Sequence, residues 1–310
     1  MLNCCTLMPP ALLEIPAAVL GREELERKIH TTYDRTASYK QFLDYRSEGD
    51  TRLQDNIGRL YRTPYGALAS TTTILSATGG NKAALERWNQ KNPGKREEAA
   101  KRGTLVHSYM ERYMLGERNF EIDPAVEPFW RDLPKNLDKL GRCIWAENPL
   151  HDAFPWCVGA DGISRVWHPG RCESEVRGWA GAPDLIFEYK GKIVLGDLKT
   201  SANRYYARWP GPETPKSEYG LKRAGFLKYE KCQRQMASYA LACEHTIGIK
   251  PEILMTFVCT EETTQVFAIQ GSTIDKYKEK WWDTVDKFYD ELSNKKLNEI
   301  DMEVVDGDKN

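Results

Sequence analysis

Two charged residues, Asp197 and Lys199, follow an apolar run in the segment "GAPDLIFEYKGKIVLGDLKTS", residues 181–201. Because residues two apart on a strand point to the same face, the two side chains should project together. Asp184 opens the strand predicted before them, and the turn "YKGK" connects the two strands. Antiparallel pairing across this turn would bring both carboxylates to one edge of a sheet. Such a pair suits Mg²⁺ or Mn²⁺, and Lys199 beside it could orient a water molecule or stabilise charge on a phosphate.

The same pattern has a simpler interpretation. Asp184 would then be a turn residue, and Asp197 and Lys199 a solvated ion pair at a strand end. A pair of polar residues further along the chain favours a site instead. Gln235 and Tyr239, in "QMASY", have i, i+4 spacing on a predicted helix. Both could therefore reach a phosphate or Lys199 from one helix face.

A histidine upstream could add a nitrogen ligand to the two carboxylates. His107 and Glu111, in "GTLVHSYME", also have i, i+4 spacing on a predicted helix. Taken alone, His107 is better explained as a core or capping histidine. Together with Asp184 and Asp197 it could complete the shell of a metal ion.

These motifs, in this order, resemble those of the PD-(D/E)XK nuclease superfamily. G-x-x-D ends at Asp184, D-x-K-T-S begins at Asp197, and Q-x-x-x-Y begins at Gln235. The RecB-like exonuclease branch also has an upstream G-x-x-x-H, here ending at His107. The wider segments "STTTILSATGGNKAALERWNQKN", "RGTLVHSYME", "QMASYALA" and "IDKYKEKWWDTVDKFYDEL" are similar to the mitochondrial genome maintenance exonucleases and their phage and bacterial relatives. The resemblance spans roughly residues 58–293.

The resemblance implies a fold and a set of site residues. The implied fold is α/β (α+β), with a central mixed β-sheet flanked by helices in a restriction-endonuclease-like core. The implied ligands of Mg²⁺ or Mn²⁺ are His107, Asp184, Asp197 and the backbone carbonyl of Leu198. The implied catalytic residues are Asp184, Asp197, Lys199, Gln235 and Tyr239. Thr200 and Ser201 match the T-S of the motif and could contact a phosphate, and Glu147 occupies the position of a family glutamate.

Two insertions depart from the family pattern, near residues 150–176 and 202–232. The second follows Lys199 and alternates basic with aromatic residues. Its candidate DNA contacts are Arg204, Tyr205, Tyr206, Arg208, Trp209, Lys222, Arg223 and Lys228, and its further aromatic residues are Tyr219, Phe226 and Tyr229. Aromatic faces can stack bases at about 1–3 kcal/mol each while cations follow the backbone. The segment therefore predicts contact with single-stranded DNA; the alternative is a Pro-rich surface loop with some aromatic residues packed inward.

The net charge of the whole chain does not suggest DNA binding, but the local charge after Lys199 does. The 310 residues carry a net charge of −1, which does not by itself suggest a nucleic-acid binder. Between residues 199 and 234, however, nine Lys/Arg stand against three Glu, a net of +6, while residues 281–310 carry nine Asp/Glu against four Lys, a net of −5. Eight cysteines without regular pairing favour a reducing compartment. No apolar run approaches the ~20 residues of a membrane span. We therefore expect a cytoplasmic protein, in the host cytoplasm if it is phage-encoded, with no membrane partner.

Hydrophobic periodicity divides the chain into three parts. Residues 1–57 are predicted to be a partly helical N-terminal extension, residues 58–294 an exonuclease domain, and residues 295–310 a polar tail. Within the domain, two short strands precede a segment capped by Ser70 or Thr71, and helices follow over 81–92 and 95–118, the second interrupted or restarted at Gly103. A helix with proline breaks is predicted for 121–145. Strands then dominate up to Lys199, and a helix over 228–245, two strands and a last helix over 273–293 complete the domain.

Cysteine and histidine residues offer two competing metal sites. His151, Cys157, His168 and Cys172 lie within one insertion, but their spacing matches no zinc finger, so zinc stays an open alternative. Some RecB-like nucleases hold an iron–sulfur cluster with three closely spaced cysteines after the Q-x-x-x-Y helix. Here only Cys243 and Cys259 follow Gln235, so no iron–sulfur cluster is expected.

The sequence thus predicts a Mg²⁺- or Mn²⁺-dependent deoxyribonuclease, an exonuclease that prefers single-stranded DNA or DNA ends, with DNA as its partner. By resemblance it would serve DNA replication, recombination or repair, in a phage or a cell. Two alternatives stay open. One is a double-strand-specific exonuclease of the phage recombination type, and the other is a non-catalytic DNA-binding protein that keeps the nuclease fold.

Overall fold

A computed structural model of the chain describes residues 60–63, 66–79, 82–141, 143–146, 178–179, 181, 183–247 and 250–306. The predicted N-terminal extension and the insertion near 150–176 lie outside these ranges. So do Glu147 and the possible zinc ligands His151, Cys157, His168 and Cys172. The predictions made for these segments therefore stay predictions.

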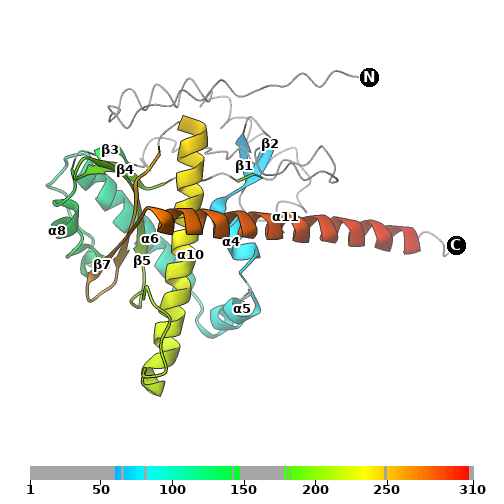
Figure 1. Cartoon of the computed structure of the whole chain (residues 1–310). Helices are drawn as coiled ribbons and strands as arrows, with labels where there is room; N and C mark the ends of the chain where they lie inside the picture. Colours follow the sequence, from blue (N-terminus) through cyan, green and yellow to red (C-terminus); the bar gives the residue numbers. More distant parts are fainter. Residues whose placement is uncertain are drawn as a thin grey trace.

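A five-stranded mixed sheet forms the centre of the described chain (Figure 1). Its strands, in spatial order, are β3 (Cys143–Ala146), β4 (Leu185–Tyr189), β5 (Lys192–Thr200), β6 (Ile253–Cys259) and β7 (Thr264–Gln270). β5 and β6 are parallel, and the other neighbouring pairs are antiparallel. With helices flanking it, this sheet confirms the predicted α/β class.

The hairpin of β4 and β5 sets the register that the site depends on. Lys190 and Gly191 form its two-residue turn, and both have positive φ, 53° and 75°. Such turns match the right-handed twist of the strands they join, and glycine adopts positive φ at little cost. The turn pairs Tyr189 with Lys192 and Leu185 with Gly196. The start of β4 therefore lies beside the far end of β5, as the sequence predicted for Asp184 and Asp197.

Two long helices cover the two faces of the sheet. Side chains alternate along β5, so Val194 and Leu198 join the core under α6 (Lys95–Met114), while Ile193 and Leu195 join the core under α10 (Lys216–Ile247). α10 is also the crossover that a parallel β5–β6 pair requires. Each end of β5 is therefore fixed from both faces.

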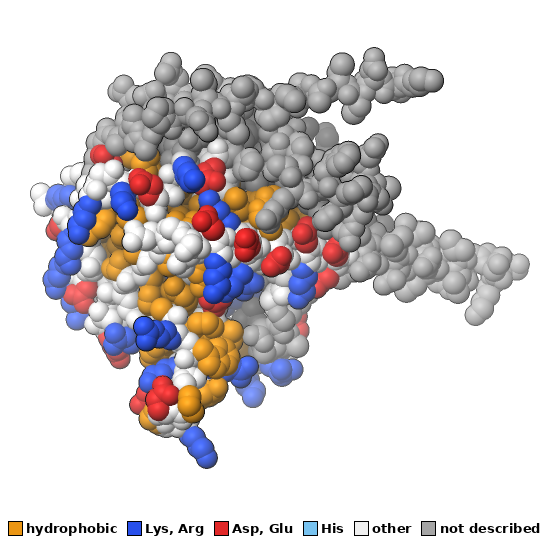
Figure 2. Space-filling view, viewed as in Figure 1, with side chains coloured by type: hydrophobic (Ala, Val, Ile, Leu, Met, Phe, Trp, Pro, Cys, Tyr) orange, Lys and Arg blue, Asp and Glu red, His pale blue; other side chains and the backbone are white. Residues whose placement is uncertain are grey.

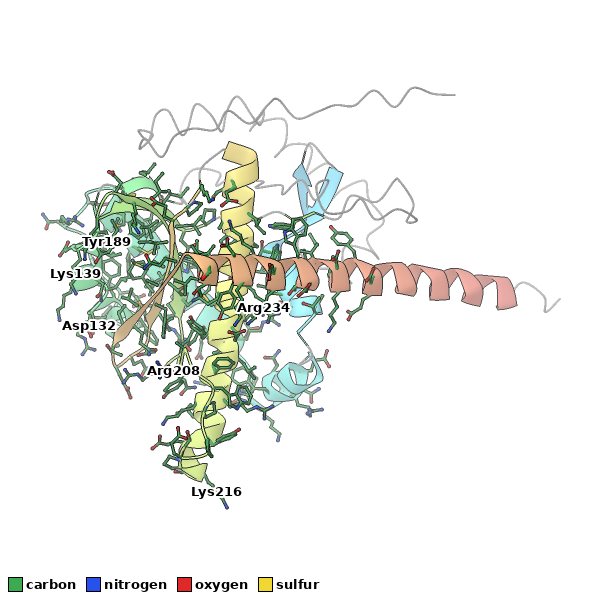
Figure 3. The ribbon with its side chains drawn as sticks, in the orientation of Figure 1. Asp132, Lys139, Tyr189, Arg208, Lys216 and Arg234 are labelled. Atoms are coloured by element: carbon green, nitrogen blue, oxygen red, sulfur yellow. The ribbon has the colours of Figure 1, made fainter. Side chains whose placement is uncertain are left out.

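A third core forms where α10 meets α11 (Ser272–Asp306) and α4 (Thr71–Ala77). α10 and α11 cross steeply in Figure 1. Arg234 of α10 lies near the crossing in Figure 3, and its Nη1 donates to Thr284 Oγ1 of α11 at 3.3 Å. Trp179 packs edge-to-face against Trp281 and Trp282 of α11. This core joins the N-terminal and C-terminal parts of the described domain.

The smaller elements precede the sheet. β1 (Leu60–Thr63) and β2 (Gly66–Ala69) form the predicted antiparallel pair, and Ser70 caps α4 by accepting the Thr73 N–H at 3.0 Å. α5 (Lys82–Lys91) follows as predicted. α7 (Glu127–Trp130) and α8 (Pro134–Leu137) are one-turn helices with proline in their first turn, where its missing N–H costs little.

Several predicted boundaries were wrong. α6 runs without interruption through Gly103, where a Cβ would lie at an ordinary contact distance, 3.5 Å, from Thr200 Oγ1 of β5. The predicted helix over 121–145 is instead α7, α8 and β3, because its prolines permit only single turns. α10 begins at Lys216, so half of the predicted second insertion is the first part of this helix. α11 continues to Asp306, through most of the predicted tail.

No helix in the described part of the chain is both long and apolar enough to cross a membrane.

Candidate active site

Asp197 lies in the row of side chains that β5 directs toward α10. It follows Ile193 and Leu195 in that row and is 2% exposed. Lys199 is next in the row, and its Nζ lies 2.6 Å from Asp197 Oδ2 with the side chain 25% exposed. Because the carboxylate of this ion pair is buried, Asp197 and Lys199 do not form a solvated pair at a strand end. The structure therefore removes the simpler interpretation of these two residues.

Asp184 is held at the same end of the sheet by two contacts. The backbone N–H of Leu198 donates to its Oδ2 at 2.6 Å, and Nδ1 of His107 lies 3.3 Å from its Oδ1. Asp184 is buried, whereas the His107 side chain is 33% exposed. α6 thus brings the predicted histidine to the predicted aspartate across more than seventy residues of sequence.

The charges of these four side chains depend on one another. Burial raises the pKa of Asp197 to about 6, even though Lys199 acts to lower it. Burial also acts to raise the pKa of Asp184, but His107, Lys199 and the Leu198 N–H together outweigh it and the net shift is downward. For His107 and Lys199, burial lowers the pKa, and the neighbouring carboxylates more than compensate, so both are raised. Lys199 is therefore protonated at neutral pH, which suits a cation better than a general base.

Gln235 and Tyr239 complete the predicted set from α10. Gln235 Nε2 donates to Tyr239 Oη at 2.8 Å, and both side chains are buried. Burial and the negative charge of Asp197 raise the pKa of Tyr239. The tyrosine hydroxyl is therefore close enough to Asp197 to be affected by its charge. Gly181 allows this approach, since a Cβ there would lie 2.5 Å from Tyr239 Cε1.

By donor type, the two carboxylates of Asp184 and Asp197 fit a hard divalent cation such as Mg²⁺ or Mn²⁺, whereas the imidazole of His107 is a ligand more typical of softer cations such as Fe²⁺ or Zn²⁺. Their arrangement is less complete. Across the described residues, no three His, Cys, Asp or Glu side chains converge on one point at metal-binding separation. Each carboxylate instead has a basic partner, the His107 imidazole or the Lys199 ammonium group. When protonated, these partners supply the positive charge that a bound cation would supply.

Two residues of the site were missed by the sequence reasoning. Cys232 Sγ lies 3.8 Å from Asp197 Oδ2 and 3.6 Å from Thr256 Oγ1, and both residues are buried. Cys232 had a usable signal, because it lies three residues before Gln235 on the same helix face. Thr256 had none, since its place beside Asp197 depends on the register between β5 and β6.

The predicted DNA contacts fall into two groups. Close to the site, Lys228 Nζ donates to Ser201 Oγ at 3.2 Å, and Thr200 is half-buried at the end of β5. Tyr205 and Tyr229 belong to the core under α10, so their rings are not on the surface. For these two rings the structure matches the inward packing that the sequence left open.

The second group is exposed on the first half of α10 and the loop before it. Trp209 is 47% exposed, packs edge-to-face on Phe226 and has the Arg223 guanidinium 5.7 Å from its ring centre. Lys222 is paired with Glu218 at 2.9 Å, and Arg204 and Arg208 are exposed.

Figure 3 shows Arg208 beside this half of α10 and Lys216 at its start, away from the sheet. In Figure 2 the same region shows hydrophobic side chains between Lys and Arg side chains. We call Trp209, Arg223 and Phe226 the Trp209 cluster.

Comparison with known proteins adds little to this description. No protein-family model matches the chain, and no curated protein matches it. Among solved structures, a crystal structure from Eubacterium rectale named "Putative exonuclease" is similar over 71% of this chain and 77% of that one, at 16% sequence identity and a TM-score of 0.35. A likeness this weak carries no argument about function, which has to rest on the residues of the site.

Proposed function

We propose that this chain is a metal-dependent deoxyribonuclease that removes nucleotides from DNA ends. One observation carries the proposal: Asp184 and Asp197, both buried, meet at one end of the sheet with a histidine, a lysine and a Gln–Tyr pair around them. Burying several ionisable groups together is costly, so such a cluster marks a functional site more often than a structural one. The resemblance of its motifs to RecB-like exonucleases supplies the reaction class and a role in replication, recombination or repair.

Mg²⁺ or Mn²⁺ would be held by His107, Asp184, Asp197 and the carbonyl of Leu198. The ion, when bound, would polarise the phosphodiester and lower the pKa of a water molecule. His107 would have to be neutral to bind the ion, whereas Lys199 would keep its contact with Asp197. The charge balance in the structure supports this, because a dication could take over from His107 at Asp184 and add to Lys199 at Asp197.

Lys199 would act on the phosphate as a fixed positive charge. Its ammonium group is protonated, is held by Asp197 and still reaches solvent. It could therefore stabilise the charge that develops in the transition state, or orient the attacking water molecule. The buried Gln235–Tyr239 pair would support this end of the site by fixing the tyrosine hydroxyl.

Single-stranded DNA is the substrate we propose. The Trp209 cluster offers an exposed aromatic face beside an arginine. Trp209 lies in the loop before α10, and the other two residues of the cluster lie on α10, the helix that also carries Gln235 and Tyr239. Stacking on aromatic faces together with backbone cations binds single strands without sequence choice. The exposed basic residues Arg204 and Arg208 would follow the backbone toward the site.

The first test is cleavage of end-labelled single- and double-stranded DNA with Mg²⁺, Mn²⁺ or EDTA, using wild type, Lys199→Ala and Lys192→Ala. Lys192 is the matched control because it begins the same strand, is exposed and lies at the opposite end from Asp197. We expect metal-dependent loss of single strands in wild type and Lys192→Ala, and a loss of about 10²-fold or more in Lys199→Ala.

Other outcomes would point elsewhere. Preferential loss of duplex would favour a double-strand-specific exonuclease. DNA binding without cleavage in either metal would overturn the enzyme and favour a DNA-binding protein that keeps the fold.

A further inference from the structure

Three elements meet at one buried thiol. Asp197 of β5 and Thr256 of β6 are register partners in the parallel pair, so their side chains lie side by side on the face covered by α10. Cys232 of α10 lies over both, with Sγ 3.8 Å from Asp197 Oδ2 and 3.6 Å from Thr256 Oγ1. All three residues are at most 3% exposed. Solvent therefore has little access to these contacts.

The contacts of Asp197 are one-sided. Lys199 and Cys232 both donate to Oδ2, and among the described residues no hydrogen bond reaches Oδ1. A carboxylate held through one oxygen presents the other in a defined direction. The thiol donates from the helix side and Lys199 from the strand side, so together they restrict rotation of the carboxylate about its Cβ–Cγ bond.

We propose that Cys232 is a positioning residue for Asp197, fixing the carboxylate through Oδ2 so that Oδ1 would be available to bind a metal ion. The proposal rests on the proposed function, because it assigns Cys232 to the same metal site. Hydrogen-bond partners of metal ligands orient those ligands, and losing one costs about 10- to 100-fold in affinity or activity. A thiol is a weak donor, so the expected loss is at the lower end, about tenfold.

The test compares two buried cysteines of the same helix. Cys232 and Cys243 both lie in the core under α10, but among the described residues no hydrogen bond joins the Cys243 thiol to a site residue, whereas the Cys232 thiol reaches Asp197. Cys232→Ala and Cys243→Ala each remove one buried sulfur, so their costs to folding should be similar. Cys232→Ser restores a donor at the first position and also serves if the alanine variant folds poorly.

Two quantities are measured for each variant. One is the rise in Tm on adding Mn²⁺ to EDTA-treated protein, which needs no catalysis. The other is the Mn²⁺ concentration that gives half-maximal cleavage of a single-stranded oligonucleotide. We expect Cys232→Ala to show a smaller Tm rise and a half-maximal concentration raised about tenfold. Cys243→Ala should match wild type in both, and Cys232→Ser should lie between.

The possible failures are distinguishable. If wild type binds Mn²⁺ and cleaves DNA but Cys232→Ala behaves like Cys243→Ala, the positioning role is wrong while the proposed function stands. If wild type shows neither a Tm rise nor cleavage, the proposed function fails, and the positioning role fails with it. A Cys232→Ser variant no better than Cys232→Ala would show that volume matters rather than the donor, and would also overturn the proposal.

Discussion

Asp184 and Asp197 each have a basic side chain as a close partner, His107 Nδ1 at 3.3 Å and Lys199 Nζ at 2.6 Å. A buried carboxylate without a partner would cost several kcal/mol, so these partners stabilise the charged form of the aspartates. At the scale of single residues, the site is thus two coupled pairs of a carboxylate and a base. Space also matters at this scale, because the ring of Tyr239 packs against Gly181, where a side chain would block it.

Gly181→Ala should damage the site more than a second glycine substitution nearby. A Cβ at Gly181 would lie 2.5 Å from Tyr239 Cε1 and 3.0 Å from Thr71 Oγ1. The forced movement should cost about 1–3 kcal/mol of unfolding free energy and reduce cleavage. Gly103→Ala is the control, because its Cβ would meet Thr200 Oγ1 at an ordinary 3.5 Å and alanine favours the helix. Denaturant unfolding and cleavage rates measure both; equal losses would refute the account of Tyr239.

At the scale of elements, α10 connects the site to the exposed basic surface. One part of this helix carries Cys232, Gln235 and Tyr239, and the other carries Arg223 and Phe226. The loop before it packs closely on the helix at Gly225, where a Cβ would lie 2.6 Å from the Arg204 carbonyl oxygen. The loop and the helix therefore form one surface.

Two glycines of α10 should respond in opposite directions to alanine. At Gly220 an added Cβ meets no atom within 4 Å, so Gly220→Ala should stabilise the protein by up to about 1 kcal/mol. At Gly225 the Cβ would lie 2.6 Å from Arg204 and from the ring of Tyr206, so Gly225→Ala should destabilise it by about 1–3 kcal/mol. Denaturant unfolding decides the signs, and a stabilising Gly225→Ala would contradict the packing of the loop.

The crossing of α10 and α11 should make stability depend on pH. Glu230 accepts hydrogen bonds from the Tyr277 hydroxyl and from Lys280 Nζ, the latter at 2.6 Å. Burial raises the pKa of Glu230, but these two bonds outweigh it and lower the value below its ordinary 4.5. A lowered pKa contributes stability that is present above the unfolded pKa and is lost as pH falls through the folded one.

Glu230→Gln should therefore cost about 1 kcal/mol at pH 7, since Lys280 is partly exposed and screened by solvent. The gap between wild type and variant should close as the pH falls below about 4.5. Unfolding free energies measured across this range test it. A gap that does not narrow at all between pH 7 and pH 3 would mean that the contribution is not electrostatic.

At the scale of the whole molecule, the proposed substrate surface lies on one part of the described chain. Two tryptophans in the described part of the chain are equally exposed, at 47%; within that part, Trp209 has ring contacts with an arginine and a second aromatic residue and Trp88 has none. Trp88, on α5, is a surface tryptophan of the same exposure on a different element. Substituting Trp209 and Trp88 separately therefore distinguishes stacking at the Trp209 cluster from stacking on any exposed tryptophan.

Trp209→Ala should raise the Kd for a single-stranded oligonucleotide about tenfold, the loss of one stacked base. Trp88→Ala should leave it unchanged. Fluorescence anisotropy with a labelled oligonucleotide in EDTA measures binding without cleavage. Equal effects of the two substitutions would remove the Trp209 cluster from the DNA path.

The sequence by itself determined the elements and the chemical types of the site. Short apolar runs predicted β4 and β5, and the turn between them set the antiparallel register that brings Asp184 toward Asp197. Spacing of three or four residues placed Gln235 and Tyr239 on one helix face. These are local properties, fixed by backbone geometry over a few residues. The helix limits were predicted less accurately, because whether Gly103 or a proline of 121–145 interrupts a helix depends on the tertiary packing around it.

Only the tertiary structure decided which distant residues meet. His107 reaches Asp184 because α6 packs on β5, and Thr256 lies beside Asp197 because β5 and β6 are parallel in one particular register. It also sorted the aromatic residues after Lys199, burying Tyr205 and Tyr229 and leaving Trp209 exposed. The physical reason is the same in each case. Burial and long-range contact depend on how whole elements pack, and the spacing of residues along one segment carries no information about its neighbour in space.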